Sequence, residues 1–207
     1  NYKVDDEVIL QPGIYCSKCY YCKIRKENYC NKYSIMGETQ NGTNAEYIAV
    51  NEKYVFNKPK NLSFEEAAAM PLVYMTAYEM IVNRAKLKSN EYVLIYGGTS
   101  GVGSAAIQIC NDIGAKIISI SSNNIKCNIS KKNGAHYTIN YNDSDWTDNI
   151  KSITKNNGVD VIFEHVGYKT WNSSLKILAK GGRIVTCGST TGSNVKINLA
   201  HLFIKQQ

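Results

Sequence analysis

One segment constrains the fold of this 207-residue chain more than any other: an apolar strand, a glycine-rich turn and a helix follow one another directly. We expect the strand at Tyr92–Tyr96 and the helix at Val102–Ile113, with Gly114 as its C-cap. Glycines let a turn approach a pyrophosphate, and the start of the helix supplies free amides and the positive end of its dipole. The segment therefore predicts a dinucleotide-binding turn, and a turn without a ligand is the alternative. The residues expected to bind the dinucleotide are Gly98, Thr99, Ser100, Gly101, Val102 and Gly103.

Short apolar runs continue to alternate with helical segments after this turn. The further expected strands are Lys116–Ser121, Tyr137–Asn140, Val159–Glu164 and Arg183–Cys187. The further expected helices are Asn124–Asn133, Asp145–Thr154, Thr170–Ala179 (closed by Gly181-Gly182) and Leu199–Lys205. Five strands separated by helices predict repeated βαβ units, and hence a doubly wound parallel sheet of the α/β class.

The end of the second expected strand bears on which dinucleotide binds. An NAD(H) site places an acidic residue about 20 residues after the glycine turn, where it holds the ribose 2′-hydroxyl. Here the strand ends in Ser121 and Ser122 without an acid, and Lys126 follows. Hydroxyls and a lysine suit a 2′-phosphate, so the sequence favours NADP(H) over NAD(H). A solvated helix lysine is the alternative interpretation of Lys126.

Four cysteines gather within 15 residues, at Cys16, Cys19, Cys22 and Cys30. Four thiolates at this spacing can surround one Zn²⁺ tetrahedrally and leave no open position, which is typical of a structural site. Two disulfides or an iron–sulfur cluster are the alternatives. The other three cysteines lie in apolar runs, a distribution that suits a reducing compartment, so we expect a cytoplasmic protein.

The first 90 residues have a different character, with short β-like runs before a long helical stretch. The expected strands are Glu7–Gln11, Ala45–Val50 and Tyr54–Asn57. Ser63 and Glu66 form a capping box at the start of a helical run over Glu65–Val82, which Pro71 should break near Met70.

The net charge of +7 does not indicate a nucleic-acid partner, because only three of the 24 basic residues are arginine and the lysines are scattered. No apolar run reaches the roughly 18 residues of a membrane helix, so we expect no membrane partner either.

At four places the chain resembles the medium-chain dehydrogenase/reductase family, closest to zinc-containing, alcohol-dehydrogenase-like members of its quinone oxidoreductase branch. These places are 42–47 (GTNAEY), 62–72 (LSFEEAAAMPL), Gly97–Gly103 and 181–185 (GGRIV). The resemblance implies a partial GroES-like substrate domain with a zinc lobe over residues 1–75 and a Rossmann domain over residues 76–207. It also implies that segments are missing at both ends, so that five of six sheet strands are present and the catalytic-zinc ligands lie upstream.

The resemblance also implies roles for single residues. Thr76 would lie beside the nicotinamide, and Tyr141 would reach the 2′-phosphate. Val166, Gly188 and Ser189 would bind the cofactor at the carboxyl edge of the sheet. The alternatives are a half-buried loop aromatic for Tyr141, a core side chain for Val166 and a turn for Gly188. Leu72 stands where the alcohol dehydrogenases place a cysteine ligand of their catalytic zinc, so a catalytic zinc is doubtful and we assign no catalytic residue.

Together these features predict an NADP(H)-dependent oxidoreductase that transfers hydride between the nicotinamide and a carbonyl, enone or quinone. The expected partners are a small-molecule substrate and, in the complete protein, further copies of the same chain. A non-catalytic dinucleotide- and zinc-binding module is the alternative.

Overall fold

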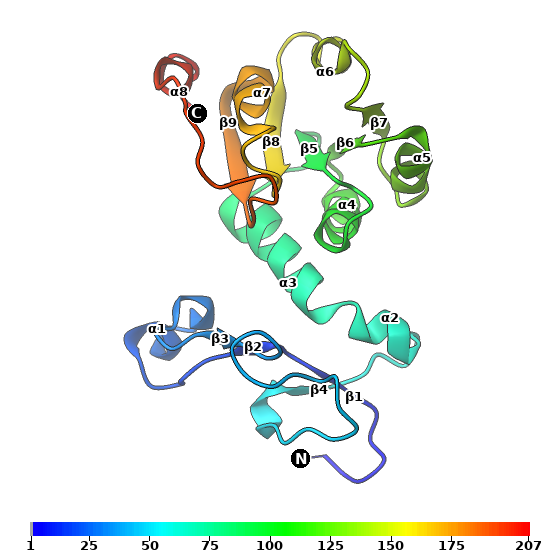
Figure 1. Ribbon diagram of the computed structural model, residues 1–207, viewed down its shortest axis with the longest axis vertical. Coiled ribbons are helices and arrows are strands. Elements are labelled where there is room, and N and C mark those ends of the chain that lie inside the picture. The colour runs from blue at the N-terminus through cyan, green and yellow to red at the C-terminus, as the bar shows by residue number, and fades with distance from the viewer. Residues whose placement is uncertain (1) are drawn as a thin grey trace. The chain divides into compact units, whose positions relative to one another are not determined.

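The computed structural model describes residues 2–207, which divide into two compact units, one ending at Leu72 and the other spanning Val73–Gln207 (Figure 1). The second unit is built on five strands in the order β7-β6-β5-β8-β9, all parallel. Their bounds are β5 Tyr92–Tyr96, β6 Lys116–Ser121, β7 Tyr137–Asn140, β8 Val159–Glu164 and β9 Leu178–Thr186. The predicted doubly wound sheet is confirmed, and the strand order reverses between β5 and β8.

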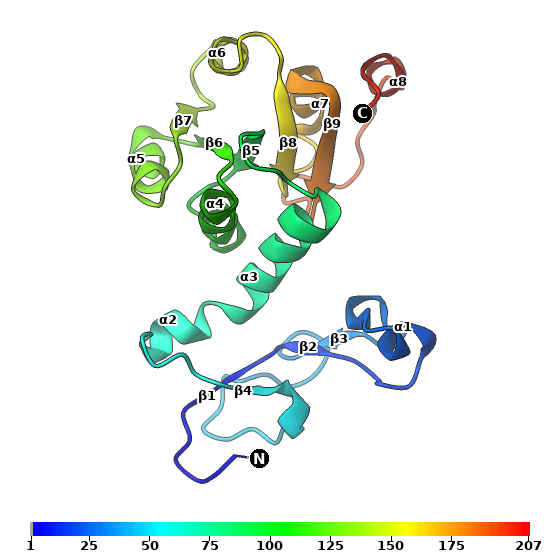
Figure 2. The ribbon, with the colours of Figure 1, turned by 180° about the vertical axis from the view of Figure 1, so that it is seen from behind.

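Helices cover both faces of this sheet because its strands are apolar on both sides. In β5, Val93 and Ile95 pack into one core with α4, whereas Leu94 and Tyr96 pack into a second core with α6 and α7. The helices are α4 Gly101–Ile113, α5 Asn124–Lys132, α6 Trp146–Ile153, α7 Trp171–Ile177 and α8 Ala200–Lys205. Figure 2 shows β8 and β9 side by side, with β6 and β7 on the other side of β5.

The expected boundary between the last helix and the last strand of the sheet is wrong. We expected a helix to Ala179 and a strand at Arg183–Cys187, but α7 ends at Ile177 and β9 begins at Leu178. Val159 faces Leu178 while Val161 faces Arg183, so the residues between them form a bulge in β9. In the sequence, Gly181 and Gly182 resemble the end of a helix. In the structure they lie in a bulge within β9, where Gly181 adopts a φ of +72°.

The first unit contains two antiparallel strand pairs. Strand β1 (Val8–Leu10) pairs with β4 (Val55–Asn57), and β2 (Gly13–Ile14) pairs with β3 (Ser34–Ile35). The remaining elements of this unit before residue 60 are α1 Tyr20–Lys23 and the 3₁₀ turns Glu27–Tyr29 and Glu52–Tyr54. The expected strand at Ala45–Val50 is wrong: this segment pairs with no strand among the described residues, and most of its side chains are exposed.

The predicted break at Pro71 is confirmed, since α2 (Phe64–Ala68) ends before it and α3 (Pro71–Tyr78) begins with it. The capping box is confirmed as well: the Glu66 amide donates to Ser63 Oγ (3.2 Å), and the Ser63 amide donates to Glu66 Oε2 (2.9 Å). A π-helical turn, Glu79–Arg84, extends the helical run two residues beyond the expected end. In the part of the chain described here, we find no helix of the length and apolarity that a membrane span requires.

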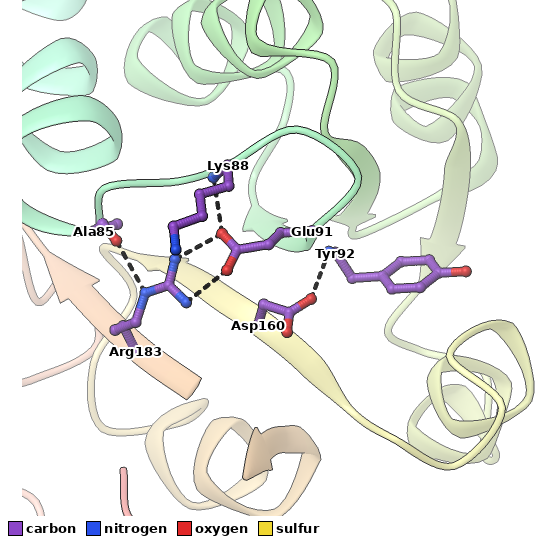
Figure 3. Close-up of polar contacts among 6 residues, drawn as sticks. All are labelled: Ala85, Lys88, Glu91, Tyr92, Asp160 and Arg183. Atoms are coloured by element: carbon purple, nitrogen blue, oxygen red, sulfur yellow. Dashed lines mark hydrogen bonds and ion pairs between the residues drawn. The ribbon is translucent and has the colours of Figure 1, made fainter. Parts of the chain in front are cut away.

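A charged cluster holds the amino edge of the sheet together (Figure 3). The terminal nitrogens Nη1 and Nη2 of Arg183 both donate to the Glu91 carboxylate (3.0 and 2.7 Å). The third guanidinium nitrogen, Nε, donates to the carbonyl of Ala85 (2.9 Å). Burial alone would raise the pKa of Glu91, but Arg183 and the amide of Lys88 lower it overall. The cluster joins the glycine bulge of β9 to the start of β5, which fixes the position of the edge strand.

We expect Arg183→Gln to lower the free energy of unfolding by about 1–2 kcal/mol at pH 7, because a bidentate, partly buried ion pair is lost. The pKa of Glu91 is lowered in the folded state, so the contribution is complete above the unfolded pKa of about 4.3 and disappears as the pH falls through the folded value. Urea unfolding at pH 7 and at pH 3 measures both effects.

Arg84→Gln is the matched control, since Arg84 Nε lies at the same 2.7 Å from Glu79 but on a more exposed surface. We expect this variant to lose less than about 1 kcal/mol. An equal loss of unfolding free energy in the two variants would show that the partly buried Arg183 pair stabilises the fold no more than an exposed pair does.

Candidate functional site

A cavity of about 770 Å³ opens at the carboxyl ends of the sheet strands. In open α/β sheets ligands bind at this edge, where the strand order reverses, which here is the point between β5 and β8. The cavity brings together seven of the residues predicted from the sequence to bind a cofactor. They are Thr99, Ser100, Ser121, Ser122, Lys126, Tyr141 and Val166.

The other predicted residues lie outside the cavity wall. The glycine-rich loop after β5 contains Gly98, and the first turn of helix α4 contains Gly101, Val102 and Gly103. Gly188 and Ser189 belong to the loop after β9, immediately before two residues that line the cavity, and Thr76 lies in α3.

The glycine turn has the compact geometry that close approach of a ligand requires. Gly97 adopts a φ of +60°, and its carbonyl accepts a hydrogen bond from the Ser100 amide (2.8 Å). Ser100 caps α4, because its Oγ accepts from the amide of Gly103 (3.0 Å). A Cβ at Gly103 would overlap the carbonyl oxygen of Gly97, so only glycine lets α4 pack this closely against the end of β5.

The polar groups of the cavity suit an anionic ligand that carries ribose hydroxyls. Lys126 and Lys169 both line it, and within residues 2–207 neither ammonium group is paired with a carboxylate. None of the residues that line it is Asp or Glu in the described part of the chain. Among residues 2–207 the buried hydroxyl of Ser121, a residue of the cavity wall, has no hydrogen-bond partner. These groups fit a dinucleotide.

Sequence reasoning missed about half of the cavity wall. The residues it missed are Tyr96, Gly97, Ile120, Trp146, Lys169, Thr170, Ser173, Thr190 and Thr191. One signal was available: Lys169 and Thr170 follow β8 just as Ser122 and Lys126 follow β6, and residues after parallel strands converge on one edge. Trp146 and Ser173 lie on helices and carry no such signal.

The four clustered cysteines have the geometry of a metal site. Their sulfur atoms all lie within 4.8 Å of one another, with Cys16–Cys22 at 3.9 Å and Cys19–Cys22 at 3.5 Å. Four sulfurs at about 2.3 Å from a tetrahedral Zn²⁺ would be about 3.8 Å apart. All four thiols are free, so the disulfide alternative does not describe this structure. The residues fit a closed zinc site.

Backbone amides point at these sulfurs, as expected where thiolates carry negative charge. The amides of Lys18 and Cys19 donate to the sulfur of Cys16 (3.4 and 3.3 Å) and lower the pKa of its thiol to about 6. The amide of Lys32 donates to the sulfur of Cys30 (3.3 Å). In contrast, burial raises the pKa of the Cys22 thiol to about 12, a cost that a bound cation would remove.

Comparison with known proteins finds matching families, curated relatives and solved structures. Residues 101–207 match the family model of zinc-binding dehydrogenases, and residues 1–60 match the alcohol dehydrogenase GroES-like domain. The quinone oxidoreductase of Homo sapiens is 34% identical over 151 residues, which cover 73% of this chain and 46% of that protein. The crotonyl-CoA reductase of Streptomyces collinus is 36% identical over 174 residues, covering 75% of this chain and 39% of that one.

Among solved structures, one described as an NAD-dependent alcohol dehydrogenase aligns with a TM-score of 0.93 at 38% identity, covering 97% of this chain and 59% of that one. A quinone oxidoreductase of Pseudomonas syringae aligns with a TM-score of 0.68 at 31% identity, covering 74% of this chain and 47% of that one. The chain thus spans about half the length of the relatives that it matches.

We expect the purified chain to hold one zinc ion, and Cys30→Ser to abolish its retention, because a closed site needs all four sulfurs. Metal content after gel filtration, measured by elemental analysis, checks this. Cys187→Ser is the matched control, since Cys187 lies outside the cluster, and it should retain the metal. Equal zinc content in the two variants would contradict the site.

Proposed function

This chain belongs to the medium-chain dehydrogenase/reductase family, and from that premise we propose that it is an NADP(H)-dependent oxidoreductase. In this proposal residues 1–75 belong to a substrate domain and residues 76–207 form the cofactor domain. The observation that carries the proposal is the cavity at the carboxyl edge of the sheet, with its glycine turn and two lysines that pair with no carboxylate among residues 2–207. Zinc at the four cysteines would have a structural role.

The position of each cavity residue supports a direction for the cofactor. The adenosine end of a dinucleotide lies beside the strand that follows the glycine turn, which is β6 here. Ser121, Ser122 and Lys126 follow β6, and Tyr141 follows β7 beside it. We place the 2′-phosphate among these four residues, at a cavity wall to which the described residues contribute no carboxylate. The nicotinamide end then faces the loops after β8 and β9.

The nicotinamide would supply the hydride, and the residues of this chain would bind and orient it. The substrate class follows from the relatives, which are described as reductases of a quinone and of crotonyl-CoA. Both substrates contain a carbon–carbon double bond next to a carbonyl. We propose that this protein likewise reduces an electron-poor enone or quinone, and Leu72 in place of a metal-ligating cysteine supports this over zinc-assisted alcohol chemistry.

Two competing functions make different predictions. A solved relative is described as NAD-dependent, which makes NADH the competing cofactor. The other competitor is a non-catalytic module that binds zinc and a dinucleotide. Oxidation of NADPH in the presence of a quinone or an enone would exclude that module. The oxidation is measured as the loss of nicotinamide absorbance.

We expect the chain to bind NADPH at least about tenfold more tightly than NADH, because a charge-assisted contact to the 2′-phosphate contributes about 1.5–3 kcal/mol. Lys126→Met should weaken NADPH binding about tenfold and leave NADH binding unchanged. Titration followed by nicotinamide fluorescence measures both constants.

Lys131→Met is the matched control, because Lys131 lies on the same helix α5 and does not line the cavity. It should bind both cofactors as the unmodified chain does. Tighter binding of NADH by the unmodified chain would contradict the NADP(H) assignment, and binding of neither cofactor by folded chain would contradict the proposed function as a whole.

A further inference from the structure

A buried carboxylate at the switch point of the sheet has no role in the function proposed above. Glu164 is the last residue of β8 and is fully buried. Within residues 2–207 no lysine, arginine or histidine forms an ion pair with it. Its two oxygens instead accept hydrogen bonds from four neutral groups. A buried charge that is held only by oriented dipoles is costly, so its surroundings must be well ordered.

Three of the four donors belong to the loop that follows β8. The amides of Val166 and Gly167 donate to Glu164 Oε1 (2.6 and 3.1 Å), and the hydroxyl of Thr170 donates to Oε2 (2.8 Å). The loop is therefore closed around the carboxylate. Val166 and Thr170 line the cavity, as does Lys169 between them.

The loop after β9 is in turn attached to this first loop. The amide and the hydroxyl of Thr191 both donate to the carbonyl of Val166 (2.8 and 2.7 Å), and the amide of Tyr168 donates to the carbonyl of Gly192 (3.0 Å). Gly167 has a φ of +89°, and a Cβ there would lie 2.5 Å from the carbonyl oxygen of Gly192. The two loops thus form one continuous wall, to which Thr190 and Thr191 contribute.

The fourth donor connects the same carboxylate to the strand on the other side of the switch point. The hydroxyl of Ser174 lies 3.3 Å from Glu164 Oε2 and 3.0 Å from the hydroxyl of Tyr96, which lines the cavity at the end of β5. His165 Nε2 lies 2.8 Å from the carbonyl oxygen of Tyr96. The network therefore reaches both sides of the cavity.

We propose that Glu164 is a positioning residue that holds the loops 165–170 and 188–192 in the form that binds the nicotinamide end of the cofactor. This inference rests on the proposed function for the identity of the ligand. A carboxylate suits the role because it only accepts hydrogen bonds, and the two amides on Oε1 have no other acceptor among the contacts described. Without it they would be buried and unpaired, and the loops would adopt other arrangements.

The experiment compares Glu164→Ala, Glu164→Asp and Glu164→Gln in the chain as it stands, with two measurements. Titration with NADPH gives the dissociation constant, and amide hydrogen exchange without cofactor reports on the loops. The informative amides are those of Tyr168 and Thr191, which join the loops and do not contact Glu164. Asp148→Asn is the control, since Asp148 is an exposed carboxylate on α6 that pairs with Lys151.

We expect Glu164→Ala to weaken NADPH binding about tenfold, as it would if the competent arrangement were present about a tenth of the time. Exchange at Tyr168 and Thr191 should accelerate by a similar factor.

Glu164→Asp should behave like the Ala variant, because its shorter carboxylate cannot reach both loop amides in the same positions. Glu164→Gln should stay close to the unmodified chain, because its amide oxygen still accepts from Val166 and Gly167 while the hydroxyls of Thr170 and Ser174 can turn to accept from its amino group. Asp148→Asn should change neither measurement.

Unchanged binding in a folded Ala or Asp variant would overturn the inference. So would weaker binding without faster exchange in the loops, or a Gln variant as impaired as the Ala variant. If the Ala variant does not fold, the Asp and Gln variants decide. If the unmodified chain binds no cofactor, the proposed function fails, and the exchange data alone still show whether Glu164 holds the loops.

Discussion

The candidate site at the carboxyl edge of the sheet depends on a backbone contact that one methyl group would prevent. Helix α4 approaches the end of β5 so closely that a Cβ on Gly103 would overlap the carbonyl oxygen of Gly97. That carbonyl also accepts the hydrogen bond from the Ser100 amide that closes the turn. The tight turn brings the start of α4 to the cavity at the switch point of the sheet, where amide donors and the helix dipole favour an anion.

Carboxylates are placed so that none of the described ones lines the cavity at this edge. At the amino edge, Glu91 is neutralised by Arg183, and the pair serves to anchor β9. At the carboxyl edge, Glu164 is withdrawn into the interior and satisfied by neutral donors. Lys126 and Lys169 therefore remain unpaired within the described chain and available to a ligand. Glu91 thus bonds to Arg183 at the amino edge, and Glu164 bonds to the loop after β8 at the carboxyl edge. Within the described residues, neither carboxylate pairs with Lys126 or Lys169.

Sequence patterns predicted the sheet well where local and tertiary preferences agree. The bounds of β6, β7 and β8 match their expected residues, because each is a β-branched or aromatic run between turn signals. The bulge of β9 was missed, since its glycines resemble a helix end and only Arg183 and the pairing with β8 show otherwise. Thr191 was missed for a similar reason: its loop takes its shape from the loop after β8, which is a long-range contact.

The first unit shows why the cysteine cluster matters beyond its own loop. Among the described residues up to Leu72, the buried apolar side chains are only Cys30, Tyr54 and Ala67. Within this segment, apolar burial therefore contributes little to ordering the chain. The structure compensates with polar contacts, such as Lys53 Nζ, which lies 2.7 Å from Ser17 Oγ and over the rings of Tyr15 and Tyr54. A tetrahedral metal would supply several strong bonds at one point, so the four sulfurs can order the loop over residues 16–30, whose side chains are mostly exposed.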